Sequence, residues 1–136
     1  MLRVGSMVAR RFEELVVWQL ARELERRVYA FTDESAVAKD FDYCSQIRRS
    51  SSSSPRNIAE GFGRYLPGDF CKFLRNALGS LAETRDHLDA GLERRYLTHN
   101  AHHELQTLAN RATGAGVRLA KYLDSCKGRW SRRRRK

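Results

Sequence analysis

The sequence predicts an all-α protein: one antiparallel four-helix bundle in up-down-up-down order. Apolar residues recur at steps of three and four in four segments, and never at the step of two that strands require. The chain has 136 residues, 41% hydrophobic and 31% charged, which is ordinary for a single domain that buries its own core. Short connections between the four segments favour neighbouring antiparallel helices with coiled-coil-like packing.

The first helix is expected from about Phe12 to Phe31. Leu15 and Trp18 lie outside its main apolar stripe, as do Val16 and Leu20. Because a second apolar face commonly marks a subunit interface, Leu15 and Trp18 are candidate interface residues. The alternative is a wide core stripe that half covers Trp18. The main stripe consists of Val17, Ala21, Leu24, Val28 and Phe31.

A turn at residues 33–35 precedes the second helix, which includes the serine run Ser50–Ser54 followed by Pro55. Composition alone would make this run a linker. However, Ile47 and Ile58 are eleven residues apart, about three helical turns, and two of the serines fall at the core positions between them. The spacing therefore predicts one continuous helix, in which serine hydroxyls satisfy carbonyls that Pro55 leaves unbonded. A break with Pro55 opening a new helix is the alternative.

The third helix begins after a break that glycine and proline residues cause at 63–68, and the fourth begins after a second break before Thr98. Asp69 is the expected N-cap of the third helix. Small residues near the stripes of the later helices indicate close helix packing. The third stripe is Phe70, Leu74, Ala77, Leu81, Thr84 and Leu88, and the fourth is Ala101, Leu105, Leu108, Ala112, Ala115, Leu119, Tyr122 and Cys126.

The formal charge of +10 lies at the two ends of the chain. This predicts a basic arm over residues 1–11, a formally neutral bundle over 12–126, and a disordered basic tail over 127–136. Such a tail is attracted to polyanions, and Trp130 within it offers a ring on which an unpaired base can stack. A solubilising terminus and a membrane-surface contact are the alternatives. The candidate nucleic-acid-binding residues of the tail are Lys127, Arg129, Trp130, Arg132, Arg133, Arg134, Arg135 and Lys136.

Other features of the composition point to a cytoplasmic protein. The longest aliphatic or aromatic run, residues 15–18, is far short of a membrane span, and the first residues lack a signal-peptide core. Cys44, Cys71 and Cys126 form an odd, widely spaced set, which is typical of reduced thiols rather than of a disulfide framework.

The block around the serine run resembles a known family. Its residues are Gln46-Ile47-Arg48-Arg49, Ser53, Pro55, Asn57-Ile58-Ala59-Glu60-Gly61 and Gly63-Arg64. This pattern is similar to the signature of the four-helix-bundle proteins first noticed in intervening sequences of bacterial 23S ribosomal RNA genes, a family that includes the accessory variability protein of diversity-generating retroelements. The resemblance covers roughly residues 12–123. The chain departs from it at Ser50, Ser51, Ser52 and Ser54, where the family usually has Ala, Val or Ile.

The resemblance implies a cytoplasmic bundle assembled as a closed homopentamer. It also implies no enzymatic activity for most members, and a Pro55 tolerated inside a long helix. The retroelement relative suggests a basic ring that binds nucleic acid and a reverse transcriptase.

Several polar residues lie close to the core stripe of the second helix, and three interpretations compete. They form a structural ion network, a nucleic-acid face, or a catalytic pair of carboxylates, although two carboxylates alone do not define acid–base chemistry. The network candidates are Arg49, Asn57, Glu60 and Glu83. The candidates for the nucleic-acid face are Arg48, Arg49, Arg56 and Arg64.

The histidines give weaker signals. His99 and His103 are four residues apart and would share a helix face, but no cysteine pair or carboxylate at ligand spacing accompanies them, so we expect no metal and no cofactor. Arg94 and His99 match the loose Arg-x4-His spacing of HEPN-type ribonucleases, which are also helical bundles.

Together these patterns predict a non-enzymatic homopentamer that binds nucleic acid, with RNA as the expected form, through its basic arms and without sequence preference. The first alternative is a structural scaffold for a protein partner. The remote alternative is a HEPN-like ribonuclease.

Overall fold

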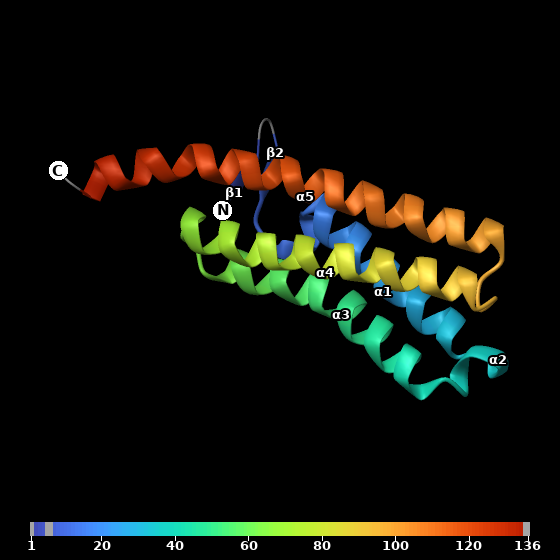
Figure 1. Cartoon of the computed structure of the whole chain (residues 1–136). Coiled ribbons are helices and arrows are strands. Elements are labelled where there is room, and N and C mark those ends of the chain that lie inside the picture. The colour runs from blue at the N-terminus through green and yellow to red at the C-terminus, as the bar shows by residue number, and fades with distance from the viewer. Residues whose placement is uncertain (1, 5–6, 135–136) are drawn as a thin grey trace.

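The computed structural model describes residues 2–4 and 7–134, and the side chains of residues 9–126. Four long helices make up the body: α1 (Val16–Thr32), α3 (Phe41–Gly63), α4 (Pro67–Glu93) and α5 (His99–Arg134) (Figure 1). A 3-10 turn, η1 (Phe12–Glu14), precedes α1, and the single-turn helix α2 (Ser35–Ala38) follows it. Strands in the described residues are confined to a short hairpin, β1 (Leu2–Val4) and β2 (Met7–Ala9).

The four long helices form an antiparallel bundle, as the sequence predicts. Helix α3 packs against α1 and α4, and α5 packs against α4 and α1, so the four helices close a ring around a shared core. Consecutive long helices run in opposite directions, and the C-terminal turns of α5 extend beyond the ends of the other three (Figure 1). None of the helices among the described residues is apolar over enough of its length to span a membrane.

The predicted stripes form the core. Leu24, Ile47, Leu81 and Leu88 belong to one apolar cluster, and Val17, Ile58, Leu74 and Leu123 belong to a second. Tyr65, which continues the apolar spacing of the second helix seven residues after Ile58, lies outside the core: it is 82% exposed and has a φ of 64°, because the chain has already left α3 and turns toward α4 in a left-handed conformation.

Helix α3 runs without a break through the serine run, which confirms the continuous helix predicted from Ile47 and Ile58. Ser50, Ser51, Ser52 and Ser54 are each at most 4% exposed. The Ser54 hydroxyl donates to the Ser51 carbonyl at 3.1 Å. This is the carbonyl that the missing N–H of Pro55 would have bonded, so the serine offsets part of the cost of the proline.

The helix boundaries correct one prediction. Pro67 occupies the first position of α4 and Leu66 is the N-cap, so Asp69 lies in the first turn rather than at the cap. Proline favours this first position because its φ is already helical and its absent N–H has no partner there. At the start of α5, the Thr98 hydroxyl accepts from the Ala101 N–H at 3.1 Å. The backbone of α5 stays helical to Arg134.

Most of the apolar residues outside the main stripe of the first helix are covered by other parts of the same chain. Leu15 is 3% exposed within the second core cluster, so the prediction that it lies at a subunit interface is wrong. Trp18 is half-buried and packs edge-on against Phe12, with ring centroids 5.3 Å apart. The wide core stripe describes this helix better, and of the apolar residues outside the main stripe Val16 is the exposed one, at 47%.

The cysteines agree with reduced thiols. Cys44 and Cys126 form no disulfide, and the Cys44 thiol donates to the Val37 carbonyl at 3.3 Å. Burial raises the pKa of the Cys44 thiol, which keeps it protonated. The Cys71 thiol lies 3.3 Å from the Asp124 carboxylate and donates to it.

Candidate nucleic-acid interface

An open groove of about 540 Å³ lies between α1 and α3. Tyr29 forms the α1 wall. The α3 wall extends from Arg48 to Glu60, about 18 Å along the helix. Three arginines and one carboxylate line it, so the groove has an excess of positive charge. Its α3 residues are Arg48, Arg49, Ser52, Ser53, Arg56, Asn57 and Glu60.

Arg48 is held in place by contacts on several sides. Its Nε donates to the Thr32 hydroxyl at 2.8 Å, and its terminal nitrogen forms a 2.8 Å ion pair with Asp33. The guanidinium lies over the Tyr29 ring, 4.8 Å from the ring centroid. The Tyr29 hydroxyl in turn lies 3.3 Å from the Ser52 hydroxyl. Arg48 and Tyr29 therefore form a fixed cation–π pair at one end of the groove.

Arg49 and Arg56 are different. Both are exposed, and neither forms an ion pair, hydrogen bond or ring contact with the rest of the described chain. They are seven residues apart on α3, two turns along one face, or about 10 Å. Their charges are available to an anion in the groove.

The two remaining polar residues of the α3 wall differ in how fully they are engaged. The Asn57 amide donates to the Ser53 carbonyl at 2.9 Å and to the Ser53 hydroxyl at 3.0 Å, which leaves the amide oxygen to accept from a ligand. Glu60 pairs with Arg64 at 2.9 Å, which offsets part of its negative charge. Arg64 also lies over the Phe73 ring, 5.1 Å from its centroid.

The structure does not join the four network candidates within one chain. Glu60 pairs with Arg64, Asn57 bonds Ser53, and Arg49 stands apart. Glu83 faces His87, whose Nε2 is buried 3.7 Å from the carboxylate, too far for a hydrogen bond. The cause is helix register: Arg49 lies on the exposed side of α3, away from α4, which carries Glu83.

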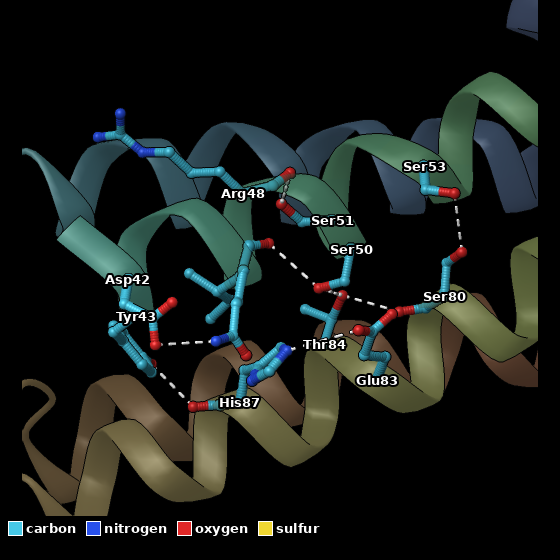
Figure 2. A network of polar contacts seen from close by, with 12 residues as sticks. Asp42, Tyr43, Arg48, Ser50, Ser51, Ser53, Ser80, Glu83, Thr84 and His87 are labelled. Carbon is cyan, nitrogen blue, oxygen red and sulfur yellow. Dashed lines mark hydrogen bonds and ion pairs between the residues drawn. The ribbon is translucent and has the colours of Figure 1, made fainter.

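A different polar network connects α3 and α4 (Figure 2). Thr84 donates to Ser50 at 2.8 Å, and Ser80 donates to Ser53 at 2.9 Å. Near the start of α3, the Tyr43 hydroxyl donates to the His87 carbonyl at 2.8 Å, and burial raises the pKa of that phenol. Figure 2 shows these contacts in a row between the two helices. One buried serine, Ser50, and the half-buried Ser53 are therefore paired across the interface with α4, which the sequence pattern did not indicate.

The residues of the ribonuclease hypothesis are not brought together as a pair. Arg94 lies at the end of α4, 3.4 Å from Asp40 and over the Tyr43 ring, whereas His99 is exposed at the start of α5. Asp40 also accepts from the Tyr96 hydroxyl at 2.6 Å and caps α3 at the Tyr43 N–H. These hydrogen bonds lower the pKa of Asp40 and give the cluster a structural role.

One of the neighbouring histidines, His102, has a structural contact of the same kind. His102 pairs with Asp89 at 2.8 Å and thereby connects α5 to α4. The part of the chain that the structure describes holds no group of three or more His, Cys, Asp or Glu side chains suited to a metal.

The candidate residues of the basic tail cannot be placed. The side chains of Lys127, Arg129, Trp130, Arg132, Arg133 and Arg134 lie outside the described residues, as do Arg135 and Lys136 entirely. Tyr29 and Ser52, by contrast, are groove residues that the sequence did not single out. They come from two helices, and no spacing within either helix links them.

Comparison with known proteins settles the family. Residues 13–115 match the family described as 23S rRNA-intervening sequence protein. The chain belongs to this family. The match ends before the predicted basic tail. No curated protein matches the chain.

The fold of this family member is similar to a solved structure. That structure is of a Bacteroides thetaiotaomicron protein of unknown function from the S23 ribosomal protein family. The TM-score is 0.72 at 23% sequence identity, and the match covers 78% of this chain and 96% of that chain. At this identity the similarity supports the helical bundle and nothing further about activity.

Proposed function

We propose that this family member is a non-enzymatic protein that binds nucleic acid, chiefly RNA, without sequence preference. The observation that carries the proposal is the groove between α1 and α3, in which Arg49 and Arg56 are exposed and have no counter-ion among the residues that the structure describes. Unpaired arginines two turns apart suit the regularly spaced phosphates of a nucleic-acid backbone. Such arginines recognise the charge and spacing of the phosphates but do not distinguish one base from another.

The overall charge supports the same function. The chain carries a formal charge of +10, contributed by the two ends. Phosphate contacts release condensed counter-ions, so this charge favours association with any polyanion at low salt. The groove then supplies a defined place on the bundle where the backbone lies.

We also propose that the chain acts as a cytoplasmic closed homopentamer. The family resemblance noted above is the support, together with the exposed apolar side chain of Val16 on α1. Five copies would raise avidity without any strong single contact. Light scattering of the wild-type protein at micromolar concentration should give five times the chain mass, and a monomer would contradict this part of the proposal.

The binding proposal is tested by retention of mixed RNA and DNA at two salt concentrations, for the full chain and for a chain ending at Cys126. We expect binding that weakens steeply with salt, a shallower slope without residues 127–136, and recovery of intact RNA. Absent or salt-independent binding would overturn nucleic-acid binding, and RNA cleavage that is lost in His99→Ala would overturn the absence of enzymatic activity.

The scaffold alternative has one observation in its favour. Phe41 and Tyr65, at the two ends of α3, are each 82% exposed, and exposed aromatics are frequent at protein contacts. A pull-down distinguishes the two functions: a protein partner stays bound after nuclease treatment, whereas a partner held through RNA is lost.

A further inference from the structure

We infer that the groove between α1 and α3 binds an unpaired strand rather than a duplex, with a base stacked on the Tyr29–Arg48 pair and phosphates on Arg49 and Arg56. The inference rests on the proposed function and narrows it to one class of ligand. It depends on three features of the groove: its stacking surface, its unpaired charges and its dimensions.

The stacking surface is already assembled. Arg48 lies over one side of the Tyr29 ring and is fixed by Thr32 and Asp33, while 40% of Tyr29 remains exposed. Aromatic rings and guanidinium planes are the surfaces on which proteins stack unpaired bases. Because both side chains are restrained before any ligand arrives, little rotamer entropy is lost on binding.

The charges lie where a strand leaving this surface would run. Arg49 neighbours Arg48, and Arg56 lies two turns further along the groove. The one carboxylate of the groove, Glu60, is paired with Arg64 beyond its end. The Asn57 amide oxygen faces no donor from the described chain and can accept from a base edge.

A duplex cannot use the stacking surface without opening. About 540 Å³ suits a few nucleotide units and is in the range of small-ligand sites. In a duplex the bases are paired and stacked on one another, so their faces cannot reach Tyr29 unless the helix opens. In a single strand the base faces are accessible without the free-energy cost of opening a duplex.

The test uses the full chain and fluorescence anisotropy with two probes: a short mixed-sequence RNA without self-complementarity, and the same strand annealed to its complement. Wild type should bind the single strand more tightly than the duplex. Tyr29→Leu should weaken single-strand binding by about fivefold or more, and Tyr29→Phe, which keeps the ring, should restore it.

The second part of the experiment compares two double variants, each of which loses two positive charges. Arg49→Gln/Arg56→Gln should weaken single-strand binding by about tenfold. The control, Lys72→Gln/Arg85→Gln, removes two exposed cations from α4 and should weaken both probes only slightly. Thermal melts of each variant confirm that the bundle is folded.

The outcomes separate the two proposals. Equal or tighter binding of the duplex, or a groove variant no weaker than its control, overturns the single-strand inference while nucleic-acid binding stands. Failure of wild type to bind either probe overturns both.

Discussion

The two faces of α3 differ in whether their polar side chains have partners within the chain. On the inner face, Ser50 and Ser54 are buried and donate to carbonyls of their own helix, and Thr84 of α4 donates to Ser50. On the outer face of the same turns, Arg49 and Arg56 have no partner in the described chain. The inner polar groups are hydrogen-bonded within the bundle, whereas the two outer arginines are the ones that we propose to contact a ligand.

Desolvation explains this division. A buried hydroxyl without a hydrogen bond costs about 1–3 kcal/mol, so the serines that replace apolar residues at core positions have to be paired. An exposed guanidinium keeps its hydration and needs no partner within the chain. Burial therefore explains which polar residues of this helix have to be paired better than residue type does.

The largest expected effect on stability is the difference between introducing an aspartate on the inner face of α3 and introducing one on its outer face. Ser51→Asp introduces a charge at a position that is 0% exposed and should lower the free energy of unfolding by about 3 kcal/mol or more. Arg56→Asp is its exposed counterpart and should cost less than about 1 kcal/mol, including repulsion from Glu60 one turn away. Urea denaturation measures both, and similar losses would show that the two faces do not differ.

A smaller effect is expected from two glycines of α4. A Cβ at Gly91 would clash with the Tyr43 hydroxyl, so Gly91→Ala should destabilise the bundle by about 1–3 kcal/mol. Gly79 has open space around it, and Gly79→Ala should stabilise the helix by about 0.5–1 kcal/mol. Thermal melts that shift in the same direction for both variants would contradict the close contact between α3 and α4 at Tyr43.

The hydrogen bond between Ser50 and Thr84 should give a coupling that a double-mutant cycle detects. Ser50→Ala alone should cost about 0.5–1 kcal/mol because Thr84 loses the Ser50 hydroxyl and keeps only the Ser80 carbonyl as an acceptor, whereas Ser50→Ala combined with Thr84→Val should be nearly neutral. The expected coupling energy is about 0.5–1.5 kcal/mol. Strictly additive losses in urea unfolding would mean that this bond does not contribute to stability.

The smallest effect concerns the start of α3 and depends on pH. Hydrogen bonds from Tyr96 and from the Tyr43 N–H lower the pKa of Asp40, so its contribution is present above the unfolded pKa of about 4 and is lost as pH falls through the folded value. Asp40→Asn should lower Tm by a few degrees at pH 7, and the gap to wild type should narrow in acid. A gap that stays constant with pH would contradict this role.

Much of the fold could be predicted from the apolar spacing. Ile47 and Ile58 located the continuous helix through the serines, because core positions repeat with the helical period whatever fills them. Leu15 was misassigned because periodicity shows that a residue is apolar but not whether its own chain covers it. The β1–β2 hairpin was missed since three-residue strands are too short to show alternation.

The site was predictable only in part. The arginines around residue 48 could be selected from sequence, and the four-residue spacing of Glu60 and Arg64 on one helix indicates their pairing, but Asp33 becomes a partner of Arg48 only in the folded chain. Tyr29 gave no signal, because its place in the groove follows from how α1 packs against α3. Pairing across helices is a tertiary property that spacing along one helix does not encode.

The most direct test of the account is the salt dependence of single-stranded RNA binding by Arg49→Gln/Arg56→Gln, measured beside its free energy of unfolding. If these two side chains contact phosphates and serve no structural role, the slope of log K against log salt becomes shallower by about 1.4, since each phosphate contact contributes about 0.7 on a single strand. The free energy of unfolding then stays within about 0.5 kcal/mol of wild type. A wild-type slope, or a loss of stability comparable to that of Ser51→Asp, would contradict the division of α3 into a structural and a binding face.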